Sequence, residues 1–169
     1  MSVCYTPCMH PNAQLLTDFY TAFARRDGNA MAACYHPDAE FSDPAFPGLR
    51  GARVTSMWRM LCERGTDLDI TFRDVQADER TGRAQWEARY TFSMSGNKVL
   101  NRVSSEFEFK DGKILRQTDR FDFWAWARQA IGGPAGVLLG WTPLVRNKVQ
   151  AQARRSLDKY MEEHGIKGA

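Results

Sequence analysis

The chain has 169 residues, which suits one domain with a short appendage, and its 43% hydrophobic and 25% charged residues are ordinary for a soluble globular protein. No apolar run approaches the roughly 18 residues of a membrane-spanning helix, and no signal peptide is recognised, so we expect a cytoplasmic protein without a membrane partner. The net charge of +3 is mild, and no nucleic-acid-binding module accompanies the basic residues near the C-terminus, so no nucleic-acid partner is expected.

The chain contains four cysteines, all of which are expected to be free thiols. Cys4 and Cys8 lie with His10 in a short polar arm, but their spacing matches no standard zinc pattern. Cys34 and Cys62 fall within helical apolar patterns, which is typical of small core residues. We therefore expect neither a metal nor an organic cofactor.

The N-terminal part of the chain has helical periodicity, interrupted by one short strand. Apolar residues between Leu16 and Phe23 recur at the positions of one helix face. Pro37 turns the chain and Pro44 ends the strand, because proline disfavours helix before it and cannot continue a ladder. In chain order we expect a flexible arm over 1–11, a helix over 12–26, a short helix ending near residue 35, a strand over 39–43, a loop over 44–51 and a helix ending at residue 65.

From residue 67 to residue 123 the apolar period changes from 3.6 to two, which predicts four long strands. Turn-forming residues separate them at 79–82, 95–97 and 110–112. Short turns between long strands predict an antiparallel meander. Helices followed by strands indicate the α+β class, with the helices on one face of the sheet.

The last segment, residues 124–169, is predicted to be a helical extension. Glycines and a proline at 132–134 break it, and Pro143 can begin the last helix. An apolar stripe from Val145 to Tyr160 must cover another surface. Either the open side of the sheet or a second subunit would serve.

A few polar residues violate the alternation of the strands. Asn101 and Ser105 fall on the apolar face of their strand, and Gln117 and Asp119 do so in the last one. Asp43 ends the short strand on its inward side. Because burying an unpaired polar group is unfavourable, polar residues clustered on an apolar surface are typical of a binding site.

Structural roles are open for several of these residues. Asn101 or Ser105 could satisfy a backbone group at a bulge, and Asp43 could hold a turn through the backbone that follows it. Asp74, near the end of the first long strand, is expected to be solvated. Asp119 is harder to explain structurally, since it lies in mid-strand with Gln117 on the same face.

A family resemblance rests on residues 16–44, LTDFYTAFARRDGNAMAACYHPDAEFSDP, and on the helix and four antiparallel strands that follow. Over residues 12–123 the chain resembles the nuclear transport factor 2-like superfamily, which includes ketosteroid isomerase, SnoaL-like polyketide cyclases and limonene epoxide hydrolase. The resemblance implies a cone-shaped curved antiparallel sheet wrapped by the N-terminal helices, with a small-molecule pocket inside. It also implies a homodimer, through the charged outer face of the sheet.

The resemblance implies several site residues, and some of these positions match the family better than others. Asp43 before Pro44 resembles the general base of ketosteroid isomerase. The isomerase's oxyanion-hole positions match Phe19 and Ser105, but Phe19 has no hydroxyl, and Tyr20 is expected to point about 100° away on the helix. Steroid isomerisation by that mechanism is therefore not expected.

Asp119 matches the other branches better, because SnoaL-like cyclases and the epoxide hydrolase resemble this chain in placing a catalytic aspartate on the last strand. The arginine and second aspartate of the hydrolase are not reproduced on the preceding strand. We expect Asp119 as principal acid/base and Asp43 as a second carboxylate, in a cofactor-independent isomerase, cyclase or hydrolase acting on a hydrophobic small molecule. The expected ligand-binding residues are Trp58, Trp86, Tyr90, Asn101, Ser105, Phe107, Gln117 and Phe121.

Two other functions are compatible with the sequence. The cone could bind a small molecule without catalysis, or serve as a dimeric scaffold. The extension at 124–164 could also fill or cap the cone.

Overall fold

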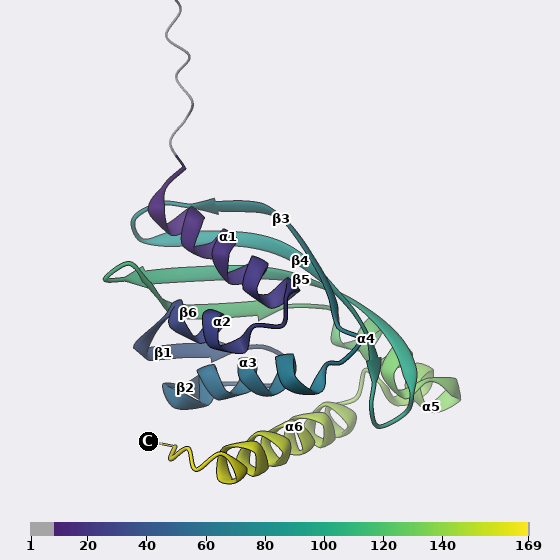
Figure 1. The fold of residues 1–169 in the computed structure, drawn as a ribbon. Helices are drawn as coiled ribbons and strands as arrows, with labels where there is room; N and C mark the ends of the chain where they lie inside the picture. The colour runs from purple at the N-terminus through teal and green to yellow at the C-terminus, as the bar shows by residue number, and fades with distance from the viewer. Residues whose placement is uncertain (1–8, 169) are drawn as a thin grey trace, which may run out of the picture.

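The computed structural model describes residues 9–168, so Cys4, Cys8 and most of the expected N-terminal arm lie outside the described residues. A six-stranded, curved and unclosed sheet has the strand order β2-β1-β6-β5-β4-β3, and α1 to α3 lie on one face of it (Figure 1). The predicted α+β class and cone shape are confirmed. The elements are α1 (Pro11–Ala24), α2 (Gly28–Ala33), β1 (Tyr35–Ser42), β2 (Leu49–Arg50), α3 (Ala52–Arg64), β3 (Asp69–Ala77), β4 (Thr81–Phe92), β5 (Asn97–Lys110), β6 (Lys113–Arg120), α4 (Phe123–Ile131), α5 (Gly133–Leu139) and α6 (Pro143–Glu163).

The four long strands form the predicted antiparallel meander, with β4 paired to β5 along nearly its whole length. Strand β6 then pairs with β1 in parallel. Strand β1 begins at Tyr35, four residues earlier than expected. The register shifts between Tyr35 and Glu40, and this irregularity accommodates Pro37, which has no N–H for the ladder.

Helix α1 begins at a cap that is local in sequence. The Nδ1 atom of His10 accepts a hydrogen bond from the N–H of Asn12, and Pro11 occupies the first turn, where a missing N–H has no consequence. The helix buries Phe19 and Tyr20 alike against the inner face of the sheet. Both residues belong to the apolar stripe that the helical periodicity predicts, with Leu16 and Phe23, which are also buried.

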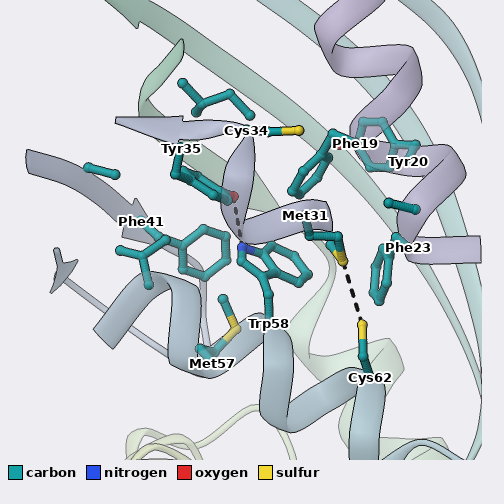
Figure 2. Close-up of a cluster of buried hydrophobic side chains, with 14 of the residues drawn as sticks. Phe19, Tyr20, Phe23, Met31, Cys34, Tyr35, Phe41, Met57, Trp58 and Cys62 are labelled. Atoms are coloured by element: carbon teal, nitrogen blue, oxygen red, sulfur yellow. Dashed lines mark hydrogen bonds between the residues drawn. The ribbon is translucent and has the colours of Figure 1, made fainter. Parts of the chain in front are cut away.

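Aromatic side chains fill the space between the helices and the sheet (Figure 2). The ring of Trp58, from α3, meets the rings of Phe19 and Phe41 edge to face, with centroids 5.5 and 5.4 Å apart. Cys34 and Cys62 are buried and free, as predicted. This packing holds the polar residues of the sheet at fixed positions.

The C-terminal extension packs on its own chain. Leu157 and Tyr160 of α6 join the main core beside α3, and Arg53 of α3 pairs with Asp158 at 2.7 Å. At the other end of α6, Val145 and Val149 pack with α4 over β5. The stripe left unassigned by the sequence is therefore covered within one chain. Among residues 9–168, no helix has the length and apolar character to cross a bilayer.

Candidate active site

Asp119 lies in β6 with its side chain toward the helices, and only 3% of the residue is exposed. Its Oδ1 atom accepts two hydrogen bonds, one from the hydroxyl of Ser105 at 2.6 Å and one from the Nε2 of Gln117 at 2.9 Å. Ser105 faces Asp119 directly across the β5–β6 ladder. Strand alternation thus brings together three of the polar residues that the sequence singled out.

Ser105 connects Asp119 to two aromatic donors. The hydroxyl of Tyr20 and the indole N–H of Trp86 each donate to the Oγ of Ser105, both at 2.9 Å. With its own proton given to Asp119, the serine hydroxyl has used one donor and two acceptor positions. Its hydrogen bonding is complete.

Gln117 makes a second, parallel connection. The hydroxyl of Tyr35 donates to the Oε1 of Gln117, and the indole N–H of Trp58 donates to that Tyr35 hydroxyl at 2.7 Å. Gln117 and Trp58 are almost fully enclosed. A buried chain of hydrogen bonds therefore runs from α3 through β1 to the carboxyl group of Asp119.

The indole groups mark the start of both chains. An indole N–H can only donate, so the Tyr35 and Ser105 hydroxyls accept from Trp58 and Trp86 and keep their own protons for Gln117 and Asp119. Gln117 then presents its carbonyl to Tyr35 and its NH₂ group to Asp119. Both chains end by donating to the same oxygen, so Oδ1 of Asp119 must be an acceptor.

The second carboxyl oxygen of Asp119, Oδ2, takes no part in this network. Oδ2 has no hydrogen-bond partner within residues 9–168. Among those residues, the Oγ of Ser56 is the only side-chain polar atom that is both fully enclosed and without a partner, so Oδ2 is not fully enclosed. Oδ2 therefore borders accessible space. Because Oδ1 is committed as an acceptor, a proton bound by Asp119 is carried on Oδ2.

Burial raises the pKa of Asp119 to about 7, although the hydrogen bonds from Ser105 and Gln117 oppose the rise. The negative charge of Asp43 adds to it. A carboxyl with this pKa is present in both its acid and its base form near neutrality. Burial likewise holds the pKa values of Tyr20 and Tyr35 well above their usual range, so both remain hydrogen-bond donors.

Asp43 follows β1 and is half-buried. Its Oδ1 accepts from the backbone N–H groups of Ala45 and Phe46, at 2.7 and 2.5 Å, which is the turn-holding role that the sequence left open. Burial nevertheless raises the pKa of Asp43 to about 6, against these two hydrogen bonds. The structure thus shows a structural role for Asp43 together with an electrostatic effect on Asp119.

Two substitutions at Asp43 separate its turn-holding hydrogen bonds from the effect of its charge. Asp43→Ala is expected to be less stable than Asp43→Asn by about 1 to 2 kcal/mol, because asparagine keeps an oxygen for the backbone N–H groups of residues 45 and 46. Both variants lack the charge, so its effect cancels in the comparison. Urea unfolding measures the difference, and equal midpoints would show that the turn bonds contribute nothing.

The other expected ligand residues divide into two groups. Trp58, Trp86 and Phe107 are core residues, with the two indoles used as donors to the network. Tyr90, Asn101 and Phe121 are half-buried on the same inner face. Tyr90 accepts a hydrogen bond from the indole of Trp126 in α4 at 2.8 Å, and burial raises its pKa.

The sequence missed two members of the network. Tyr20 was expected to point away from the site, and this was wrong, because α1 lies deep enough against the curved sheet to bury both Phe19 and Tyr20. Tyr35 was placed at a helix end, whereas it begins β1. In β1, Tyr35, Ala39 and Phe41 are all buried. This pattern is typical of core packing and does not indicate that the Tyr35 hydroxyl takes part in a hydrogen-bond network.

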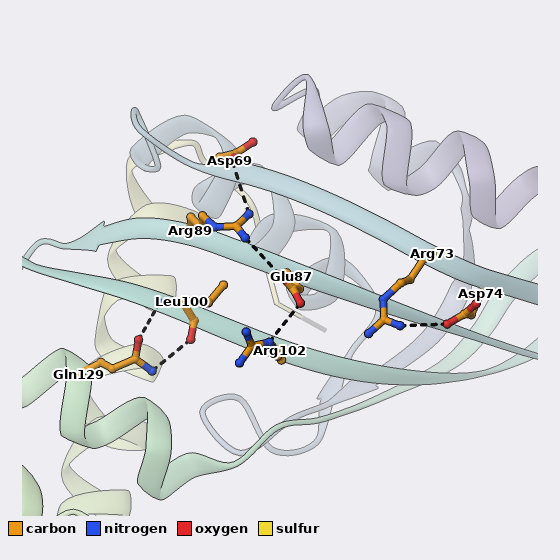
Figure 3. Close-up of polar contacts among 8 residues, drawn as sticks. All are labelled: Asp69, Arg73, Asp74, Glu87, Arg89, Leu100, Arg102 and Gln129. Atoms are coloured by element: carbon orange, nitrogen blue, oxygen red, sulfur yellow. Dashed lines mark hydrogen bonds and ion pairs between the residues drawn. The ribbon is translucent and has the colours of Figure 1, made fainter.

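The described hollows lie away from Asp119. A groove of about 610 Å³ is on the outer face of the sheet, and a smaller one of about 210 Å³ includes Phe72 and Trp86 near β3. The outer face also carries ladders of charge, in which Glu87 pairs with Arg89 and Arg102 at 3.3 and 3.1 Å (Figure 3). Within residues 9–168, no three His, Cys, Asp or Glu side chains are grouped to hold a metal ion. The pocket predicted inside the cone stays a prediction.

The fold is an α+β cone whose inner face carries one enclosed carboxyl group. A family model described as the SnoaL-like domain matches residues 16–117, which is more than half of the chain. The chain belongs to this family. The search of curated proteins found no match to it.

Several solved structures share the fold. An LEH-like epoxide hydrolase of M. tuberculosis is 20% identical, with a TM-score of 0.59 over 80% of this chain and 95% of its own. An NTF2-like protein of Burkholderia thailandensis is 23% identical, with a TM-score of 0.62 over 74% and 100%. TerC, crystallised with polyporic acid, is 18% identical, with a TM-score of 0.61 over 72% and 99%. At these identities the likeness establishes the fold alone.

Proposed function

We propose that this protein is a cofactor-independent enzyme in which Asp119 moves a proton on a hydrophobic small molecule. The observation that carries the proposal is the asymmetry of the carboxyl group. Oδ1 is held by two convergent hydrogen bonds, while Oδ2 is unpaired within residues 9–168. Oδ2 is thus free to exchange a proton with a bound molecule while Oδ1 holds the carboxyl group in place.

The network positions Asp119 as either acid or base. In the base form, Oδ2 takes a proton from a carbon next to a substrate carbonyl, and the electron pair of the broken C–H bond moves onto the carbonyl oxygen. Returning the proton to another carbon gives isomerisation, and attack of the carbanion on a second carbonyl gives cyclisation. In the acid form, Oδ2–H donates to the oxygen of an opening epoxide while water attacks the carbon, and the proton that the attacking water then loses restores the acid form of Asp119. The pKa near 7 supports all three reactions equally.

The surroundings of the site favour an apolar substrate. Phe121 and Tyr90 are half-buried beside the main core on the inner face, together with the side chain of Asn101, for which the described residues provide no hydrogen-bond partner. Aromatic walls with a few fixed polar groups are typical of small-molecule sites. Asn101 and the Tyr90 hydroxyl would orient a carbonyl, and Asp119 would carry the chemistry.

The proposal includes a movement of the C-terminal extension. Helix α4 closes over Tyr90 through the Trp126 hydrogen bond, and Gln150 of α6 donates to the carbonyl of Pro44 at 3.0 Å, next to Asp43. These contacts hold α4 against Tyr90 and α6 against the turn that Asp43 stabilises. A substrate would reach Oδ2 after α4 or α6 shifts.

A panel of lipophilic ketones, enones and epoxides tests the function. We expect turnover of at least one by the wild-type protein, and a loss of about 10²- to 10⁴-fold in Asp119→Asn, as for other removed general acids or bases. The control is Asp111→Asn, in the exposed β5–β6 turn, which should keep full activity. Unchanged turnover in Asp119→Asn would refute the assignment.

A binding or scaffold role is the second candidate. It is favoured by the outer groove, whose lining mixes acidic and basic residues such as Glu106, Arg83 and Arg116 and could pair with a second copy. If the panel gives no turnover while a lipophilic fluorophore binds equally to wild type and Asp119→Asn, the binding role is supported instead. The homodimer and the cytoplasmic location stay predictions.

A further inference from the structure

Helix α5 buries Gly136, and Gly140 at its C-cap is buried too, while the large apolar residues of the helix are exposed, the reverse of an ordinary surface helix. Gly136 and Gly140 face α4: a Cβ on Gly136 would lie 3.2 Å from the backbone oxygen of Ala127, and one on Gly140 would lie 3.0 Å from the Cβ of Ala127. The large apolar side chains all point outward. We call the following five the apolar tip: Val137, 51% exposed; Leu138, 67%; Leu139, 52%; Trp141, 69%; and Leu144, 66%.

The apolar tip projects from one end of the molecule, beside the end of the sheet that carries the β4–β5 turn (Figure 1). Two hydrogen bonds add to the packing of the two glycines against α4. The indole of Trp124 donates to the carbonyl of Val137 at 3.3 Å, and that of Trp141 donates to the carbonyl of Leu138 at 3.1 Å. A contiguous, ordered group of exposed apolar side chains on one segment marks an interaction surface.

The charges along the segment that carries the tip have one sign. From Phe123 to Leu157 the chain contains five basic residues and no acidic one, a net charge of +5 in a protein whose total is +3. Two of these residues lie over aromatic rings next to the tip. The guanidinium of Arg128 is 4.6 Å from the Trp124 ring, and that of Arg146 is 5.1 Å from the Phe123 ring.

We propose that the apolar tip docks on the surface of a lipid bilayer that contains anionic lipids. Leucine and tryptophan side chains would enter the boundary between headgroups and acyl chains, and Arg128, Arg146 and Lys148 would meet the lipid phosphates. Tryptophan is favoured at that boundary, since its ring is apolar and its N–H is polar. This is surface docking, and it departs from the expectation of no membrane partner that the absence of a spanning segment suggested.

Charge complementarity distinguishes a bilayer from a second copy. A two-fold dimer through the tip would bring the same patch of each subunit together and oppose Arg128, Arg146 and Lys148 to their equivalents. No acidic side chain between residues 123 and 157 would offset that repulsion. An anionic bilayer supplies the missing negative charge along with an apolar layer.

Co-sedimentation with vesicles tests the proposal on the full-length protein. We expect binding to phosphatidylcholine vesicles containing phosphatidylglycerol, weaker binding to phosphatidylcholine alone, and loss of binding in high salt. The double variant Leu138→Ser with Trp141→Ser should weaken binding about tenfold or more, since it removes two large apolar groups. The double variant Arg128→Gln with Arg146→Gln should weaken it by about tenfold.

Matched controls lie at the opposite end of the sheet. Met9→Ser removes another exposed apolar side chain, and Arg80→Gln with Lys110→Gln removes two exposed basic ones, from the β3–β4 turn and the end of β5. All controls should bind like the wild type. The proposal is overturned if the wild type ignores anionic vesicles, or if the tip variants bind as well as the controls. A wild-type dimer that Trp141→Ser converts to a monomer would also overturn it.

Discussion

Replacing Asp119 with asparagine is expected to stabilise the protein at about pH 8, by about 2 to 4 kcal/mol, and to leave it nearly unchanged at about pH 4. The pKa of Asp119 is about 7 in the folded state, against an ordinary value of 3.8. The folded state therefore holds its proton more tightly than the unfolded chain does. As the pH rises through this interval, folding must oppose ionisation of a buried carboxyl, and stability is lost. Asparagine has no such ionisation.

Asparagine is also a close structural substitute. Its oxygen can accept from Ser105 and Gln117 as Oδ1 does, and its NH₂ group replaces the protonated Oδ2. Thermal unfolding should show a rise in midpoint of about 5 to 15 °C at the higher pH. Asp111→Asn, at an exposed turn, is the control and should shift nothing. A less stable Asp119→Asn variant at the higher pH would mean that the carboxylate is stabilised by contacts that this structure does not contain.

Replacing Ser105 with alanine is expected to destabilise the protein by about 3 kcal/mol, the largest loss that any single hydroxyl of the site should give. The change removes the acceptor shared by Tyr20 and Trp86, and leaves two buried donors unpaired. It also removes a hydrogen bond that lowers the pKa of Asp119, so that pKa should rise further.

The matched control is Ser104, the residue that precedes Ser105 in β5. Ser104→Ala changes an exposed hydroxyl on the outer face of the same strand and should alter stability by less than about 0.5 kcal/mol. Urea unfolding of both variants at one pH gives the comparison. Equal losses in the two would show that the network contributes no more than a surface hydroxyl.

Strand parity made much of the site predictable. The period of two assigned Ser105, Gln117 and Asp119 to the inner face because each lies an even number of residues from a large apolar neighbour. Strand parity alone would place Asp74 on the inner face, but its expected exposure is confirmed, because a bulge between Arg73 and Gln76 gives the residue a φ of 56° and turns it to solvent. A bulge inserts one extra residue into a strand and so breaks the period of two, and no residue type in the sequence indicates where a bulge lies.

Such local patterns could not predict contacts between residues that lie far apart in the sequence. The Tyr35–Gln117 hydrogen bond joins residues 82 positions apart, and its formation depends on the parallel pairing of β1 with β6. Tyr20 joins the site because of the depth at which α1 packs, which follows from the curvature of the sheet. Helical periodicity gives the direction of a side chain around its helix, and the distance of that helix from the sheet decides whether the side chain is enclosed.

The central claim is that Asp119 is a carboxyl group poised between its two protonation states. The most direct test is the carboxyl ¹³C chemical shift of Asp119, followed as a function of pH in aspartate-labelled protein and assigned by comparison with Asp119→Asn. The structure predicts a titration midpoint of about 7. A midpoint near the ordinary value of 3.8 would contradict the account, since Asp119 would then be a permanently ionised structural residue.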